Sequence, residues 1–386
     1  MKIDAVECFP LKIAPKQIYL GGDGGETGVP DYYYRDEYRC VYSRKMETCL
    51  VKVTTDTGLH GWGEALAPVV PQVPAILIEE LLAPLLIGAS PFDSNVLWSR
   101  MYDAMRDRGH VTGFMLDALA ACDIALWDLK GKAAGLPVAA LLGGAYRSRQ
   151  PAYVSGLPLP TLDERLDLAS DWKAKGFHAI KAALGYGVDE DVDNIRRLRE
   201  RLGPEVALFL DAHWNYSVAE ASELAKRLEP LGLGFLEAPL LPEDVRGHAA
   251  LRAKTTIPIA LGETERTRFQ FAAFLDADGV DIVQPDVGRV GITETMRIGF
   301  QAETRNLAIA PHLSVGLGPC IAASIHVAAA LPNTFMLEYQ PPVFDIANTL
   351  LRDPLVCRQG HYEIPRAPGL GIEIDENQIR ELGRKS

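Results

Sequence analysis

Eight short apolar runs alternate with helical segments from about residue 150 onward, and this alternation restricts the possible folds more than any other feature. The segments between the runs have the length and pattern of amphipathic helices, which is typical of a parallel sheet covered on both faces. Eight such units in roughly 200 residues predict a closed (β/α)₈ barrel, the TIM barrel. The runs are Tyr153–Ser155, Ala179–Ala183, Val206–Leu210, Gly234–Leu236, Ile257–Leu261, Val280–Val283, Leu307–Ala310 and Phe335–Leu337.

The main alternative fold is an open, doubly wound parallel sheet. A dinucleotide-binding sheet of that kind carries a G-x-G-x-x-G turn after its first strand. No such motif follows the run Tyr153–Ser155, so the closed barrel is the better prediction.

The chain outside the barrel has a different pattern. The stretch Lys2–Ile13 alternates like a strand and Thr48–Thr54 is rich in β-branched residues, which favours antiparallel pairing. The stretch Thr112–Ala133 has a broad apolar face and predicts a helix that ends before Gly135. We therefore predict an N-terminal α+β domain over 1–140, the barrel over 141–350, and a tail over 351–386 that packs back on the N-terminal domain.

The charge and composition exclude several classes of protein. The chain has 39 basic and 51 acidic residues and a net charge of −12, so it has no general attraction for nucleic acid. No apolar run approaches the roughly 18 residues of a membrane span, and the N-terminus lacks the apolar core of a signal peptide. The six cysteines form no CxxC pair, which favours reduced thiols. We expect a cytoplasmic protein with no nucleic-acid or membrane partner.

A polar residue stands within the second apolar run, and another stands just after the end of each of the six runs that follow. From Asp211 onward they are 26, 26, 23, 26 and 26 positions apart. Because each unit of a barrel turns by a similar angle, these side chains are expected to meet at the carboxyl-terminal mouth, where barrel active sites lie. They are Lys181, Asp211, Glu237, Glu263, Asp286, His312 and Glu338.

Three of these residues, Asp211, Glu237 and Glu263, place carboxylates on adjacent strands. Three buried anions repel one another unless a positive charge lies between them. An all-oxygen set suits a hard divalent cation, and we predict a Mg²⁺ site. Separate ion pairs or helix caps are the structural alternative.

Two histidines are candidates for proton transfer. His312 follows the seventh run and Asp286 follows its neighbour, so the carboxylate is expected to orient the imidazole as a base. His213 lies two residues after Asp211 and is expected to face the same mouth, where it could protonate a leaving hydroxyl group. The alternative for His213 is a contact with one of the metal ligands or a hydrogen bond to the substrate.

Three further motifs, together with the residues at the strand ends, resemble the enolase superfamily, specifically its mandelate racemase-like acid-sugar dehydratases. The resemblance covers essentially the whole chain. The motifs are Gly61-Trp62-Gly63-Glu64, the helical stretch Asp123–Lys132, and Leu141-Leu142-Gly143-Gly144.

The resemblance implies a hydro-lyase that removes the proton α to the carboxylate of an aldonate or aldarate. His312 would remove the C2 proton and His213 would assist loss of the C3 hydroxyl group, giving a 2-keto-3-deoxy acid. Mg²⁺ would stabilise the enediolate, and Lys181 and Glu338 would contact the substrate carboxylate. We also expect the protein to form a homo-oligomer.

The sequence departs from the resemblance at the second strand. Racemases of the family often carry Lys-x-Lys there, whereas this chain has Lys181-Ala182-Ala183. Alanine cannot act as a base, so two-base racemisation loses its usual partner. A lactone cycloisomerase, an epimerase, or a metal-binding protein without turnover remain the alternative functions.

The stretch Gly21–Tyr42 is rich in Gly, Tyr and Arg and has no periodicity, which predicts a long loop. Such a loop could close over the barrel mouth, and it supplies Tyr33 and Arg35 as candidate substrate-binding residues. A surface loop or a subunit contact is the alternative interpretation.

Overall fold

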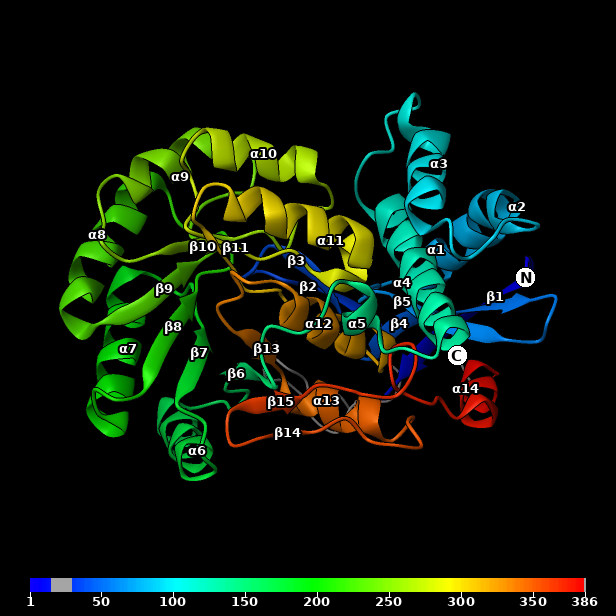
Figure 1. The fold of residues 1–386 in the computed structure, drawn as a ribbon. Coiled ribbons are helices and arrows are strands. Elements are labelled where there is room, and N and C mark those ends of the chain that lie inside the picture. Colours follow the sequence, from blue (N-terminus) through cyan, green and yellow to red (C-terminus); the bar gives the residue numbers. More distant parts are fainter. Residues whose placement is uncertain (15–29, 385–386) are drawn as a thin grey trace.

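The computed structural model describes residues 1–14 and 30–384 and contains the predicted barrel. Figure 1 shows its strands enclosed by helices, with a second body of strands and helices beside it. Seven strands pair in parallel in the order β12-β11-β10-β9-β8-β7-β6, and β13 pairs with β6. The barrel strands are β6 (Arg149–Ser155), β7 (Ala179–Ala183), β8 (Ala207–Asp211), β9 (Leu233–Glu237), β10 (Ile259–Leu261), β11 (Ile282–Val283), β12 (Ala308–Ile309) and β13 (Leu337–Tyr339).

Backbone hydrogen bonds close the ring between β12 and β13. The Ile309 amide donates to the Asn333 carbonyl at 3.1 Å, and the Phe335 amide donates to the Ile309 carbonyl at 2.8 Å. The eight apolar runs of the sequence therefore correspond to the eight strands, with ends shifted by at most two residues except at the start of β6, which begins four residues before its run. The barrel prediction is confirmed.

Aromatic side chains fill the inside of the barrel below its mouth. The rings of Phe209 and Phe235 stack with centroids 4.1 Å apart, and Tyr153 meets both edge-on. Small residues such as Ala179 and Ala260 face them and leave the room that the rings occupy. Because this interior is packed, the polar side chains at the carboxyl ends of the strands form a floor rather than the wall of a channel.

The helices that follow the barrel strands form its outer layer (Figure 1). Two of them begin with a capping box, in which Thr161 pairs with Glu164 and Ser217 pairs with Glu220. The helices are α6 (Leu162–Ala174), α7 (Val188–Leu202), α8 (Val218–Leu228) with the short η2 (Glu229–Leu231), α9 (Val245–Arg252), α10 (Arg268–Asp276), α11 (Val287–Glu303), α12 (Pro319–Ala330) and α13 (Pro341–Asn348).

The N-terminal body is an α+β capping domain built on a three-stranded antiparallel sheet. Its sheet has the order β1-β4-β5, and its longest helix, α4, packs across β5. A Cβ atom at Gly63 would lie 1.9 Å from the Ala121 carbonyl oxygen, so glycine is needed for this close approach. The elements are β1 (Ile3–Ile13), β4 (Met46–Thr55), β5 (His60–Ala65), α1 (Gln72–Leu77), η1 (Ile78–Leu82), α2 (Ala83–Leu86), α3 (Ser94–Arg106), α4 (Phe114–Ala134) and α5 (Val138–Leu141).

The C-terminal tail contacts both bodies. Its strand β15 (His361–Glu363) pairs with β14 (Cys357–Arg358) and with β6 of the barrel. Its helix α14 (Glu376–Gly383) lies beside the capping sheet, where Glu376 pairs with Lys52 at 2.7 Å. The predicted fold class, a barrel with a capping domain formed by both ends of the chain, is confirmed, whereas the exact domain boundaries stay predictions.

Part of the stretch predicted as a loop is a hairpin. The strands β2 (Tyr32–Arg35) and β3 (Cys40–Ser43) pair in antiparallel register, and residues 36–39 form the turn between them. The earlier part of that stretch, 21–29, lies outside the described residues. Within the described parts of the chain, no helix has the length and apolar character needed to cross a membrane.

A buried carboxylate joins the capping domain to the barrel. Glu64 in β5 is fully buried and accepts hydrogen bonds from the amides of Leu317 at 2.6 Å and Cys320 at 3.0 Å. Thr48 donates a third bond at 2.8 Å. Burial raises the pKa of Glu64, and these donors oppose that rise. The carboxylate thus caps the first turn of α12 and holds the segment that follows His312.

Replacing this cap is expected to destabilise the fold. Glu64→Ala leaves the two buried amides of Leu317 and Cys320 without this acceptor, at about 1–3 kcal/mol each, whereas the Thr48 hydroxyl keeps its bond to the Ala65 carbonyl. We expect a clearly lower melting temperature for Glu64→Ala. The control is Glu373→Ala, which removes an exposed partner of Arg352 and should change stability by no more than about 0.5 kcal/mol. Equal melting of the two variants would show that the cap contributes nothing.

Candidate active site

The polar residues predicted at the strand ends do meet at the barrel mouth. Asp211 and Glu237 are the last residues of β8 and β9 and are direct neighbours in register. A cavity of about 390 Å³ opens above them. Its barrel wall includes five of the residues named from the sequence, Lys181, Asp211, His213, Glu263 and His312.

Lys181 is the positive charge at the base of this cavity. Its side chain is 1% exposed, and Nζ lies 2.7 Å from Glu237 Oε1, 3.0 Å from Glu338 Oε1 and 3.7 Å from Asp211 Oδ2. Burial alone would lower the pKa of Lys181, but the carboxylates of Glu237 and Glu338 outweigh burial and hold it well above its usual value. These contacts hold Lys181 as a cation among the three carboxylates.

His312 lies between two carboxylates. Its Nδ1 is 2.6 Å from Asp286 Oδ2, and its Nε2 is 2.9 Å from Glu263 Oε2. Asp286 is fixed in turn, because its other oxygen accepts a hydrogen bond from the Gly288 amide at 2.8 Å. Burial opposes protonation of His312, but the charges of Glu338 and Glu263 prevail and raise its pKa well above the usual value. The Asp286 contact leaves Nε2 as the nitrogen that faces the cavity.

The three predicted metal ligands differ in their surroundings, and Asp211 has Lys181 Nζ 3.7 Å from its Oδ2. Glu237 is bound by Lys181 and by Gln284 Nε2 at 2.7 Å, and burial raises its pKa to about 8 against the effect of Lys181. Glu263 is bound by His312 and by Trp214 Nε1 at 3.1 Å; burial would raise its pKa, but His312 lowers it well below the usual value.

The donor set suits Mg²⁺, although its side chains are turned toward other partners. Asp211 and Glu263 both add to the rise in the pKa of Glu237, as expected where each carboxylate repels that group. Their oxygens are the donors that Mg²⁺ prefers. Within residues 1–14 and 30–384, however, no three His, Cys, Asp or Glu side chains are arranged as a metal site as they stand. The carboxylate oxygens of these residues are suitable donors for Mg²⁺, and their assignment as its ligands stays a prediction.

His213 faces the same cavity from the loop after β8. It adopts a left-handed backbone with φ 49°, which is costly for a residue other than glycine. Its ring stacks on Tyr38 with centroids 4.1 Å apart, and its Nδ1 lies 3.5 Å from Asp211 Oδ1. The two candidate proton-transfer histidines, His213 and His312, therefore line one cavity.

The β2–β3 hairpin supplies the opposite wall of the cavity. Tyr38, Val41 and Tyr42 line it, whereas the predicted substrate-binding residues Tyr33 and Arg35 do not. Tyr33 packs beside Tyr42 with ring centroids 6.3 Å apart, and Arg35 lies 4.8 Å from the ring centre of Tyr38. A role for Tyr33 and Arg35 in substrate binding stays a prediction.

Sequence reasoning missed other residues of the cavity. Trp214 and Arg289 line it, and Arg289 Nη1 donates to the Glu263 carbonyl at 3.0 Å. The one available signal in the sequence was position, because Trp214 directly follows His213 and Arg289 lies three residues after Asp286.

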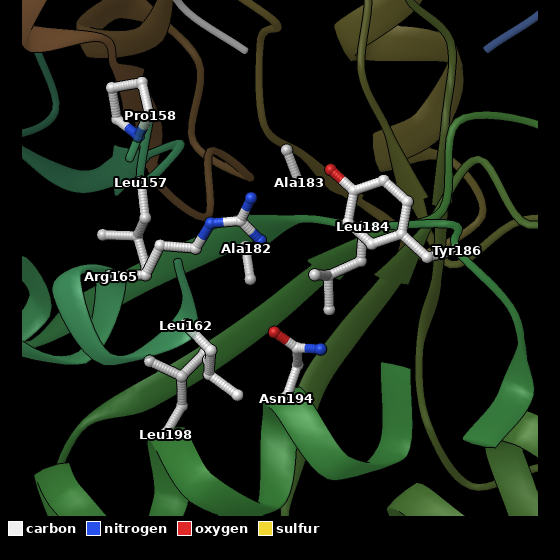
Figure 2. Close-up of a pocket in the computed structure, with 10 residues that line it drawn as sticks. All are labelled: Leu157, Pro158, Leu162, Arg165, Ala182, Ala183, Leu184, Tyr186, Asn194 and Leu198. Atoms are coloured by element: carbon white, nitrogen blue, oxygen red, sulfur yellow. The ribbon is translucent and has the colours of Figure 1, made fainter. Parts of the chain in front are cut away.

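A second, smaller cavity lies outside the barrel mouth. Figure 2 shows its lining side chains, which include Ala182, Ala183 and Tyr186 from β7 and the segment after it. Its volume of about 20 Å³ accommodates roughly one water molecule, so it is too small for a substrate. Ala183 thus lines an outer cavity and offers no base to the main one.

Two family models match this chain, one over most of the barrel and the tail and one over most of the capping domain. The family model described as "Enolase C-terminal domain-like" matches residues 164–378, and that of the "Mandelate racemase / muconate lactonizing enzyme, N-terminal domain" matches residues 41–143. The chain belongs to the enolase superfamily. Its predicted membership in the mandelate racemase-like subgroup is confirmed.

Three curated relatives have names that concern sugar acids or a lactone of one. The D-galactarolactone cycloisomerase of Agrobacterium fabrum is 37% identical, over 86% of this chain and 90% of the relative. The D-galactonate dehydratase of Ralstonia pickettii is 35% identical, over 87% and 91%. The arabinonate dehydratase of Saccharolobus solfataricus is 33% identical, over 88% and 92%.

Solved structures match over nearly the full length. A member of the enolase superfamily from Agrobacterium tumefaciens is 39% identical with a TM-score of 0.93, over 98% of both chains. A racemase from Streptomyces coelicolor A3(2) with bound magnesium is 26% identical with a TM-score of 0.86, over 98% of this chain and 99% of that one. Members of this family therefore bind Mg²⁺ in the fold described here.

Proposed function

We propose that this protein catalyses the Mg²⁺-dependent dehydration of a sugar acid, an aldonate or aldarate, to a 2-keto-3-deoxy acid. The observation that carries the proposal is the presence of two histidines on one cavity, of which His312 has a carboxylate 2.6 Å from its Nδ1, whereas the carboxylate nearest to Nδ1 of His213 lies 3.5 Å away. Relatives named as galactonate and arabinonate dehydratases support it. The proposed substrate is a small soluble carboxylate, which suits the predicted cytoplasmic location.

The proposed chemistry begins with His312. Asp286 holds Nδ1 as a donor, so that Nε2 can accept the C2 proton once Glu263 no longer binds it. The electron pair of the C2–H bond first moves into the substrate carboxylate and gives an enediolate, which can take the proton back. In the next step the pair returns to form a C2–C3 double bond as the C3–O bond breaks. His213 gives a proton to the departing oxygen, which leaves as water, and the resulting enol becomes the 2-keto acid.

The rest of the site stabilises the negative charge that develops on the substrate carboxylate. Asp211, Glu237 and Glu263 would hold Mg²⁺, which when bound supplies Lewis-acid stabilisation of that charge. Lys181 provides a fixed positive charge at the base of the cavity, and Glu338 keeps Lys181 in place at 3.0 Å.

Metal removal is expected to lower stability. A ligand that binds only the folded state stabilises it by RT ln(1 + [L]/Kd), about 2.7 kcal/mol at a hundredfold excess over Kd. We expect a higher melting temperature in Mg²⁺ than in EDTA. Glu237→Gln should abolish this difference, while Glu373→Ala should keep it. Identical melting of the native protein in both conditions would contradict the metal site.

Ring opening of a lactone or anhydro sugar acid is the second candidate function. The relative at 37% identity is named a D-galactarolactone cycloisomerase, which favours it. The same abstraction of the α proton would expel a ring oxygen instead of a hydroxyl group, and because that oxygen stays attached, the product would be an isomer of the substrate.

A screen of aldonic acids, aldaric acids and their lactones with Mg²⁺ tests both candidates. Dehydration lowers the product mass by one water molecule, ring opening leaves it unchanged, and both give a 2-keto acid. Exchange of the α proton with solvent deuterium without either product would indicate an epimerase. No turnover and no exchange with any compound would indicate a metal-binding protein without catalysis.

A further inference from the structure

We propose that Tyr38 and Arg39, adjacent residues in the turn of the β2–β3 hairpin, are positioning residues that hold His213 in place for proton transfer. The inference rests on the proposed function, because it assigns to the capping domain the orientation of the group that protonates the leaving oxygen.

The loop that carries His213 has a strained backbone. His213 and Trp214 are consecutive non-glycine residues with positive φ, 49° and 60°. Each such residue costs roughly 1 kcal/mol or more and persists only where its surroundings hold it. Within the loop the backbone is fixed by the Trp214 amide, which donates to the Ala238 carbonyl at 2.7 Å. The ring of His213 needs a separate constraint, because its Nδ1 is buried and makes no hydrogen bond within the part of the chain that the structure describes.

Tyr38 supplies that constraint. Its ring lies on the His213 ring at 4.1 Å and 25°, close to parallel. Tyr38 is itself 7% exposed, and its hydroxyl group is 2.9 Å from that of Tyr186, a barrel residue shown in Figure 2. The Tyr186 amide donates to Asp191 at 3.1 Å. Tyr38 is thus anchored on the barrel at one end and stacked on the histidine along its face.

Arg39 binds the residues that directly follow His213 in the same loop. Its Nη2 donates to the Trp214 carbonyl at 3.0 Å and to Asn215 Oδ1 at 3.1 Å. Asn215 Nδ2 donates in return to the Glu37 carbonyl at 2.7 Å. The bonds run in both directions between the hairpin turn and the residues that follow His213. Arg39 does not line the cavity, so it acts on the reaction only through the loop.

His312 is held independently of the hairpin. Its ring is fixed by Asp286, and its amide donates to the Pro285 carbonyl at 3.2 Å, both inside the barrel. Loosening the hairpin turn should therefore weaken protonation of the leaving oxygen and leave abstraction of the C2 proton in place. A general loss of folding or of substrate binding would instead lower both steps together.

The test compares Tyr38→Leu, Tyr38→Phe and Arg39→Met in the full-length protein with Mg²⁺. The rate of dehydration and the rate of C2 exchange with deuterium are measured for each variant under saturating substrate. We expect Tyr38→Leu to lower the ratio of dehydration to exchange about two- to tenfold, the usual effect of a lost aromatic stack. Arg39→Met should lower it less, and Tyr38→Phe, which keeps the ring, should restore it toward the native ratio.

A second measurement does not depend on turnover. Amide hydrogen exchange, read by mass spectrometry, should become faster over residues 212–216 in Tyr38→Leu and Arg39→Met and stay unchanged over residues 283–290. Unchanged exchange over 212–216, or an equal fall of dehydration and C2 exchange, would overturn the inference. If the native protein shows exchange protection of this loop but dehydrates no sugar acid, the proposed function fails while the contact between hairpin and loop stands.

Discussion

The variant His312→Asn is expected to lose both dehydration and exchange of the C2 proton with solvent deuterium. Asparagine keeps some polarity near Asp286, but its amide nitrogen cannot accept a proton. We expect a fall of about 10⁴-fold, the upper end of the effect of a positioned acid or base, or roughly 5–6 kcal/mol in the barrier. A loss of this size is expected because Ala183 provides no second base.

The readout is C2 exchange, followed by NMR on a substrate identified in the screen. His361→Asn serves as the matched control, because His361 lies in β15, whose pairing with Pro151 places it toward the start of β6 and away from the mouth. The control should exchange at the native rate. Native exchange in His312→Asn would show that another group removes the proton, and His213 would then be the next candidate.

The barrel and its polar mouth could be predicted because both leave local signals. Each strand is a continuous apolar run, and residues such as Asp211 and Glu237 follow at regular intervals. A polar residue at the end of a buried strand must face either the mouth or a partner, so its position alone restricts its role.

The pairing of side chains within the site could not be predicted in this way. The sequence places Lys181 and Glu263 at the mouth, but not Lys181 between Glu237 and Glu338, or Glu263 against His312. These contacts depend on rotamers chosen among several nearby charges, which carry no periodic signal.

The capping hairpin was missed for a similar reason. The run Tyr32–Arg35 does not alternate between apolar and polar residues, and among the described strands it pairs with β3 alone, in a two-stranded sheet without a buried face of its own. Tyr38, which lies on His213, stands in the turn between the two strands, where periodicity gives no information.

His213→Asn is expected to slow dehydration by about 10²–10⁴-fold, the usual effect of removing a positioned acid. Exchange of the C2 proton should remain measurable, because His312 and its contact with Asp286 are left intact. The expected result is thus a selective loss of one step rather than a general loss of activity. The C2 proton is still removed and returned, but the hydroxyl group rarely leaves. Equal losses of exchange and dehydration would contradict the assignment of separate roles.

A substrate analogue with fluorine in place of the C3 hydroxyl group tests the role of His213 more directly. Fluoride leaves with much less need of a proton than hydroxide does, so elimination from the analogue should depend little on an acid. We expect His213→Asn to release fluoride at a rate close to that of the native protein, while His312→Asn should release almost none, because the C2 proton must still be removed. If His213→Asn were as slow with the fluoro analogue as with the hydroxy acid, His213 would be needed before the C3–O bond breaks, in binding or in proton abstraction, and its place as the acid would be lost.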